Sequence, residues 1–199
     1  MHQTALCFYF GHGTEQNDAA AVQWFEKAAA EDNAASINRL GLCYELGRGV
    51  EEDVEKACTY YRKAAEMGLA DAQCNLGWMY RTGRGVEESF ENAVFWYEKA
   101  VEQGYARAQY LLAECLRRGV GCAVDEEEAV QWYRSAAWLG LPTAQTEFGR
   151  CLEFGVGVHQ DMAQAIRWYR AAAENGHAPG QCCLGFCYET GKGVEQNWE

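Results

Sequence analysis

The chain has 199 residues, of which 49% are hydrophobic and 13% aromatic, and its formal net charge is −12. This composition predicts an ordered, soluble protein with a core, and the acidic charge argues against a nucleic-acid surface, which needs clustered lysine and arginine. No apolar run reaches the roughly 18–20 residues that span a bilayer, and no signal peptide is apparent at the N-terminus.

The sequence repeats itself every 36 residues. Without a gap, one column holds Gly47, Gly83, Gly119, Gly155 and Gly191. An internal repeat of this length predicts a solenoid of stacked units. The units run over residues 1–34, 35–70, 71–106, 107–142 and 143–178, with a half unit at 179–199. We expect one domain over residues 1–199, because no linker or change of composition separates the units.

Each unit predicts two amphipathic helices, and residues 71–106 show the pattern most fully. In the first helix, small and large apolar residues recur at helical spacing, at Ala72, Leu76, Gly77 and Tyr80. Gly83 and Gly85 are expected to end it, because glycine enters the left-handed region without steric penalty. The second helix carries Ala93, Trp96, Tyr97 and Ala100, and is expected to end at Gly104.

The start of each second helix is marked by a residue that favours the N-cap position. This column holds Asn17, Asp53, Ser89, Asp125, Asp161 and Asn197, whose side chains can accept a hydrogen bond from a backbone N–H. Glu128 and Gln164, three residues after their caps, predict capping boxes. One hairpin cannot bury its apolar faces alone, so neighbours must stack. We therefore expect an all-α fold, a right-handed α-solenoid of helix-turn-helix units.

The repeated residues match a known family. The pattern Ala-x3-Leu-Gly-x2-Tyr-x2-Gly-x-Gly-Val, followed by Ala-x2-Trp-Tyr-x-Lys-Ala-Ala and a closing glycine, resembles the Sel1-like repeats, a branch of the tetratricopeptide-repeat superfamily. The resemblance covers essentially the whole chain. Its departures are mild: Ala113 stands in the glycine column of Gly77, and Asp32 in the column of the closing glycine. It implies adaptor or scaffold work in assembling complexes or in signalling.

Both ends of the chain fall inside the repeat. Met1 aligns with Ile37 in a first helix, and Asn197, Trp198 and Glu199 align with the N-cap and start of a second helix. Terminal units of a solenoid usually have an altered, polar outer face, and neither end shows one. We interpret the chain as a fragment of a longer array, which leaves a lost signal peptide possible and the localisation open.

The ten cysteines predict packing rather than chemistry. One column holds Cys7, Cys43, Cys115, Cys151 and Cys187. Consecutive cysteines of this column lie one unit apart, which is roughly 10 Å or more for packed helices. A disulfide needs Cα atoms within about 7 Å. No paired C-x2-C spacing predicts zinc. In the disulfide-stapled bacterial branch of the family, the cysteines stand at the end of the second helix and at the start of the next helix. This chain has Ala65 and Gln73 in those columns, so it lacks the disulfide of that branch. We expect ten reduced thiols and a reducing, cytoplasmic compartment.

Repeated aromatic residues also predict a core. Two adjacent columns hold Trp24, Tyr60, Trp96, Trp132 and Trp168, and Phe25, Tyr61, Tyr97, Tyr133 and Tyr169. Because structural columns repeat and binding columns vary, we interpret them as packing rather than as a stacking platform. The four histidines are scattered, and no phosphate loop or nucleophile elbow occurs. We therefore predict no catalytic residue, no cofactor and no metal site.

Function should lie in the columns that vary. In the tetratricopeptide geometry that the resemblance implies, the first helices line a concave wall at the columns of Cys74, Trp78, Arg81 and Thr82. Guanidinium groups suit carboxylates, and aromatic rings suit apolar side chains. The alternative is that the arginines only balance Glu45, Glu114, Glu153 and Glu189 as solvated surface pairs. The predicted partner-binding groove contains Trp78, Arg81, Tyr110, Arg117, Arg118, Arg150 and Phe154.

The sequence thus predicts a non-catalytic scaffold or adaptor whose groove binds an extended or helical segment of another protein that carries acidic groups, without nucleic acid or membrane insertion. One alternative is a structural or self-associating repeat array. Another is a hydrolase of cell-wall-like substrates, as proposed for bacterial members of the family, but the sequence shows no nucleophile with a base. The partner's identity and the oligomeric state stay open.

Overall fold

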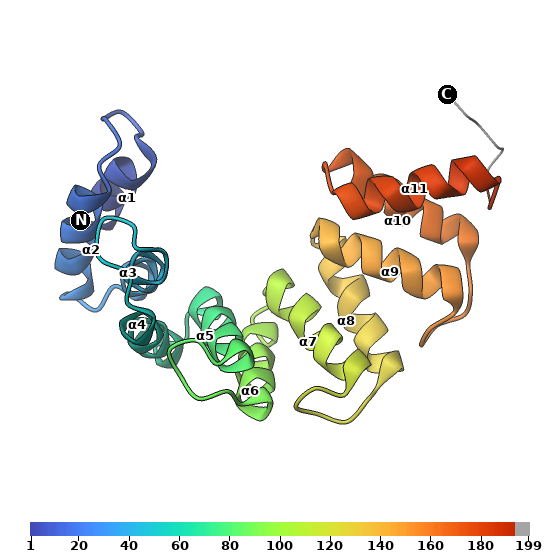
Figure 1. Ribbon diagram of the computed structural model, residues 1–199, viewed down its shortest axis with the longest axis horizontal. Helices are drawn as coiled ribbons and strands as arrows, with labels where there is room; N and C mark the ends of the chain where they lie inside the picture. Colours follow the sequence, from blue (N-terminus) through green and yellow to red (C-terminus); the bar gives the residue numbers. More distant parts are fainter. Residues whose placement is uncertain (194–199) are drawn as a thin grey trace. The chain divides into compact units, whose positions relative to one another are not determined.

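The structure is a computed structural model that describes residues 1–193. Over these residues it contains eleven α-helices and no strand. Two compact units can be distinguished, Met1–Gln103 and a second one that begins at Gly104, and Figure 1 labels the helices of each. The predicted all-α fold is confirmed, and the right-handed superhelix and the single domain stay predictions.

The first unit contains three helix pairs, and the second contains two pairs and a further helix. The first comprises α1 (His2–Phe10), α2 (Asp18–Ala29), α3 (Ala34–Leu46), α4 (Val54–Glu66), α5 (Ala70–Thr82) and α6 (Phe90–Val101). The second comprises α7 (Ala106–Arg118), α8 (Glu126–Trp138), α9 (Pro142–Phe154), α10 (Met162–Glu174) and α11 (Ala178–Thr190). Within each unit, the second helix of a pair packs against its own first helix and, where another pair follows, against the first helix of that pair.

The predicted caps begin the second helices. The side chains of Asn17, Asp53, Ser89, Asp125 and Asp161 each accept a hydrogen bond from the backbone N–H three residues later, at 2.8–3.2 Å. Asn197, the sixth predicted cap, lies outside the described residues, as do Trp198 and Glu199.

The predicted capping boxes are wrong in their second bond. The backbone N–H of Asp125 donates to the carbonyl of Leu116 at 3.0 Å, in the preceding first helix, so it is not available to Glu128. Glu128 accepts instead from the indole N–H of Trp132 at 3.1 Å. The same backbone bond recurs at the other four caps within residues 1–193, and it ties the start of each of these second helices to its first helix.

Glycines end the first helices as predicted, and the second glycine of each Gly-x-Gly also makes a close contact. Gly83 and Gly85 both have positive φ, at +63° and +65°. A Cβ on Gly85 would lie 2.2 Å from the carbonyl oxygen of Val54, at the start of the previous second helix. Gly157 lies in the same way against Glu126. This glycine is therefore needed both for its backbone conformation and for the contact between consecutive repeats.

The turns that follow the second helices differ slightly from prediction. Helix α6 ends at Val101, three residues before Gly104, which follows with a φ of +74°. Asp32 occupies the same place after α2 and is the one described residue other than glycine with positive φ. Aspartate tolerates this left-handed conformation better than most residues do, which explains why it can replace the glycine.

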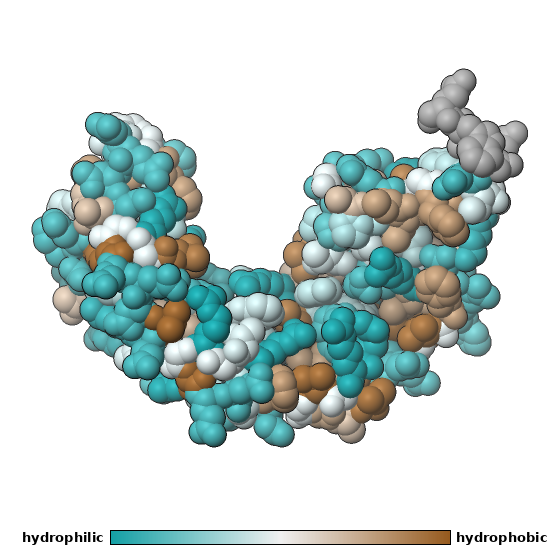
Figure 2. Space-filling view, in the orientation of Figure 1, coloured by the Kyte–Doolittle hydropathy of each residue, from teal (hydrophilic) through white to brown (hydrophobic). Residues whose placement is uncertain are grey.

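The predicted aromatic core is confirmed. Phe25, Tyr61, Tyr97, Tyr133 and Tyr169 are fully buried, while the aromatic residue before each of them is half-buried. The rings lie against the glycine column of the first helices, since a Cβ on Gly77 would be 2.6 Å from the ring of Tyr97. In Figure 2 the surface in view is largely hydrophilic, with scattered apolar side chains. No helix within residues 1–193 is long and apolar enough to cross a membrane.

Candidate functional site

The predicted groove residues all lie on first helices, and all but Tyr110 lie in the second half of their helix. Trp78 and Arg81 belong to α5 of the first unit, and the other five belong to α7 and α9 of the second unit. Each of these helices turns one face toward its buried tyrosine and the other toward solvent, so the residues differ widely in exposure. The two groups are described separately.

In the first unit, Arg81 lies beside Trp78. Its guanidinium lies 5.8 Å from the ring centre of Trp78, a cation–π geometry, and both side chains are half-buried. Among residues 1–193, Arg81 forms no hydrogen bond or ion pair. One prediction about this wall is wrong: Cys74 is fully buried and cannot contact a partner.

In the second unit, a buried carboxylate holds two of the predicted arginines. Glu114 is 5% exposed, and it accepts hydrogen bonds from the hydroxyl of Tyr133 and from Nη2 of Arg117, the latter at 3.2 Å. Arg118 pairs with its other oxygen at 2.7 Å. Arg117 also donates from Nε to the Tyr133 hydroxyl at 3.2 Å. Two cations thus surround one carboxylate, which leaves one positive charge in excess.

The environment keeps Glu114 ionised. Burial alone would raise the pKa of its carboxyl, but the hydrogen bond from Tyr133 and the charges of Arg117 and Arg118 outweigh burial, so the pKa lies below its usual value. Burial and the hydrogen bond to Glu114 raise the pKa of Tyr133, so its hydroxyl stays a donor.

The remaining three residues are more peripheral. Tyr110 is half-buried, with its ring centre 6.0 Å from that of Tyr133. Arg150 pairs with Glu147 at 3.1 Å on the surface of α9. Phe154 is 65% exposed, and the ammonium of Lys192 lies 5.3 Å from the centre of its ring.

Three of the four glutamates named in the alternative interpretation, Glu45, Glu114 and Glu153, divide into two kinds. Glu114 is neutralised by predicted groove arginines, as that alternative expects. Glu45 and Glu153 have other cations: Arg84 at 2.9 Å and Lys192 at 2.6 Å. Both also accept a hydrogen bond from a buried tyrosine of the next helix, Tyr61 at 2.7 Å or Tyr169 at 2.6 Å.

Sequence reasoning missed the ion pairs of Glu45 with Arg84 and of Glu153 with Lys192. Each of them joins one repeat to the next, and we call such a pair a clasp. The cation stands 39 residues after its acceptor, as in Glu45 and Arg84, or Glu153 and Lys192. In the first pair of repeats, Arg48 donates instead to the carbonyl of Tyr9 at 2.6 Å. Where the acceptor column holds an arginine, the residue 39 positions later is an uncharged valine, at Val120 and Val156. This complementary pattern is a sequence signal for the clasp.

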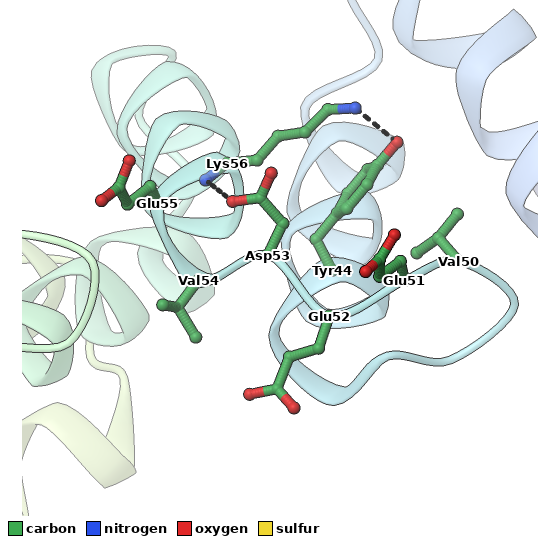
Figure 3. A pocket seen from close by; sticks show the side chains of 8 residues that line it. All are labelled: Tyr44, Val50, Glu51, Glu52, Asp53, Val54, Glu55 and Lys56. Atoms are coloured by element: carbon green, nitrogen blue, oxygen red, sulfur yellow. Dashed lines mark hydrogen bonds between the residues drawn. The ribbon is translucent and has the colours of Figure 1, made fainter.

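Two hollows lined by acidic side chains lie away from the predicted groove residues. One, of about 700 Å³, surrounds the loop between α3 and α4 and is lined by Tyr44, Val50, Glu51, Glu52, Asp53, Val54, Glu55 and Lys56. Figure 3 shows Lys56 donating to the Tyr44 hydroxyl, at 2.7 Å, and carboxylates that point in different directions. Residues 1–193 contain no cluster of histidine, cysteine and carboxylate side chains suited to hold a metal ion.

The cysteines allow a direct test of the predicted reduced thiols. All ten are free: six are buried, while Cys7, Cys122 and Cys183 are half-buried and Cys182 is exposed. Burial raises the pKa of Cys43 and Cys151 to about 11, and only the thiolate reacts. We therefore expect the disulfide reagent DTNB to label those four thiols fast and the buried six slowly at pH 8, and all ten after unfolding without reductant. Fewer than ten in the unfolded chain would reveal disulfides.

The sequence pattern of the Sel1 repeat matches residues 1–33, 34–69, 70–105, 106–141, 142–177 and 178–197. This chain belongs to the Sel1 repeat family. The matched segments begin one residue before most of the units read from the periodicity. Sel1 repeat proteins are in general protein-interaction scaffolds and are typically not catalytic.

Two solved Sel1 repeat structures are similar to this Sel1 repeat chain over 98% of its length. The Sel1 repeat protein from Oxalobacter formigenes is 32% identical, with a TM-score of 0.91, and 78% of it is covered. The protective antigen c5321 of uropathogenic Escherichia coli strains is also 32% identical, with a TM-score of 0.86, but only 42% of its chain is covered. The immunity protein Pa5087 from Pseudomonas aeruginosa, at 21% identity and a TM-score of 0.62 over 98% of this chain and 71% of its own, shares the fold. Curated protein sequences give no significant match.

Proposed function

We propose that this Sel1 repeat protein is a scaffold that binds an acidic segment of another protein along its first helices. The observation that carries the proposal is Arg81, a half-buried cation fixed over Trp78 with no carboxylate partner among residues 1–193. In a chain with a net charge of −12, an arginine left unpaired beside a tryptophan is notable. Arginine and tryptophan are also the residues most enriched in binding hot spots.

The second unit supports the same chemistry with its own residues. Arg118 is 55% exposed and shares Glu114 with Arg117, so its outer N–H groups can still bind a carboxylate. The ring of Phe154, on α9 of the same unit, is exposed for an apolar side chain. A preformed helical wall has little conformational entropy to lose on binding, which favours affinity for a flexible segment.

Charge reversal at Arg81 tests the proposal. Arg81→Glu is expected to abolish capture of the main partner from a lysate of the source cells, measured by quantitative mass spectrometry, because a carboxylate would then face the partner's acidic groups. The fold should persist, since Arg81 contributes no hydrogen bond or ion pair to residues 1–193. Arg117 is unsuitable for this purpose because its loss would also disturb Glu114 and Tyr133.

Lys27→Glu is the matched control. Lys27 is also a cation over a tryptophan, 4.3 Å from the ring centre of Trp24, but it is exposed on a second helix. Its reversal changes the net charge equally and should leave capture intact. Equal capture by wild type and Arg81→Glu would contradict the proposal. Recovery of only the protein itself, with a mass that rises with concentration, would favour the self-associating array.

A further inference from the structure

A second surface of this protein departs from the repeat and is apolar. Trp138 and Leu139, at the end of α8, are 74% and 58% exposed. In the column of Trp138 the other repeats have Ala30, Glu66, Glu102 and Glu174. Glutamate at an exposed helix end is easily accommodated, so an exposed tryptophan in its place has no evident role in packing the repeat. Exposed apolar side chains that cluster are a mark of binding sites.

Trp138 stands between two hollows of the second unit. One, of about 300 Å³, is lined by Trp138, Gln164, Arg167, Trp168 and Ala171. The other, of about 510 Å³, is lined by Gly104, Gln109, Gln131, Arg134, Ser135, Trp138 and Leu139. The ring of Trp138 meets that of Trp168 edge to face, with centroids 5.1 Å apart at 90°. This contact packs one edge of Trp138 against Trp168, which lowers the side-chain freedom that binding would still have to restrict.

The charge of these two hollows is opposite to that of the protein as a whole. Their linings contain Arg134 and Arg167 and no carboxylate. Neither arginine forms a hydrogen bond or an ion pair within residues 1–193. By contrast, the hollow at the start of α8 and the hollow before α4 are lined by several carboxylates each. In a chain with a net charge of −12, a basic and aromatic surface is complementary to an acidic ligand.

We propose that the Trp138 surface, defined as Arg134, Trp138, Leu139, Arg167 and Trp168, docks a peptide segment of another protein in which an apolar side chain is flanked by carboxylates. The apolar side chain enters the smaller hollow between the two tryptophans, and the carboxylates pair with Arg134 and Arg167. This surface is built from second helices. It therefore does not depend on the first-helix site around Arg81, and either site can fail without the other.

A random library of 12-residue peptides on phage, selected against the full chain, is the probe. We expect enriched peptides with Phe, Trp or Leu beside Asp or Glu. Synthetic copies measured by fluorescence polarisation should bind Trp138→Glu and the double variant Arg134→Glu/Arg167→Glu on the order of tenfold or more weakly, as for a hot-spot tryptophan or arginine. Trp138→Glu installs the residue that three of the other four repeats carry there, so the fold should be retained, as circular dichroism would verify.

Phe95→Glu is the control, because Phe95 is a 47% exposed aromatic residue packed edge to face on Trp96 in the first unit. It should bind the peptides as wild type does, and so should Arg81→Glu. Enriched peptides that lack carboxylates, or that bind Trp138→Glu undiminished, would overturn the proposal. A molecular mass that rises with concentration in wild type but not in Trp138→Glu would also overturn it, by assigning the surface to a second copy of the chain.

Discussion

Replacing Gly85 by alanine is expected to destabilise the protein by about 3 kcal/mol or more. Part of this loss comes from placing an L-residue at a φ of +65°, which costs about 1–2 kcal/mol. The rest comes from the new Cβ, which would lie 2.2 Å from the carbonyl oxygen of Val54 and 2.6 Å from its carbon. Backbone atoms at the start of a helix cannot move aside as a flexible side chain can, so the contact between repeats must open.

Gly13→Ala separates the two contributions. Gly13 has a φ of +74°, but nothing lies within 4 Å of the place its Cβ would take. This variant should therefore lose only about 1–2 kcal/mol, the backbone contribution. Urea unfolding followed by far-ultraviolet circular dichroism measures both. Equal losses in the two variants would show that the approach of Gly85 to α4 contributes nothing to stability.

Glu114→Gln is expected to lower the free energy of unfolding by about 2 kcal/mol at neutral pH, as for a buried hydrogen-bonded charge. The amide still offers an oxygen to Tyr133, but its NH₂ group would face two guanidinium groups. In a protein of this size the loss corresponds to a fall of about 4–8 °C in Tm. Glu147→Gln is the matched control, because its pair with Arg150 is more exposed and should contribute less than about 1 kcal/mol.

The contribution of Glu114 should also depend on pH. Its pKa in the folded protein is lowered from an ordinary 4.5, so the folded state binds fewer protons than the unfolded state as pH falls through this range. The stability difference between wild type and Glu114→Gln should then be full above about pH 5 and shrink below about 4.5, as linkage requires. Urea unfolding at pH 7, 5 and 3.5 measures it. A difference that is unchanged at pH 3.5, or no larger than that of Glu147→Gln, would contradict this account.

The local elements could be predicted because each rests on one residue in one column. Asp53 caps α4 and Gly83 ends α5, and the residues in the same columns do so in the other repeats, so periodicity alone identified them. The capping boxes failed for a reason outside the helix: the backbone N–H of Asp125 already donates to Leu116 of the neighbouring helix. A bond between helices is invisible to a rule that considers one helix at a time.

The candidate site was harder to predict because its charges interact across repeats. A wall inferred from the geometry of a related fold included Cys74, which is fully buried. Arg117 and Arg118 looked equally free in sequence, yet both are held by Glu114, whose burial depends on Tyr133 of the following helix. The clasp of Glu45 and Arg84 links two different columns of consecutive units. Comparing the residues of one column across the repeats cannot reveal a pair that joins two different columns.

The clasps also determine which repeats could be exchanged during the evolution of such an array. The contact at Gly85 involves glycine and backbone atoms, which any neighbouring repeat supplies. Whole repeats could therefore be duplicated or lost without a mismatch at this contact. The clasps are selective, because a repeat with a glutamate such as Glu45 needs a following repeat with a cation such as Arg84. Deleting residues 71–106 would give Glu45 a successor that carries Val120 and leave its carboxylate without that cation. Order along the array is therefore partly encoded in matched pairs, and the repeats are not fully interchangeable.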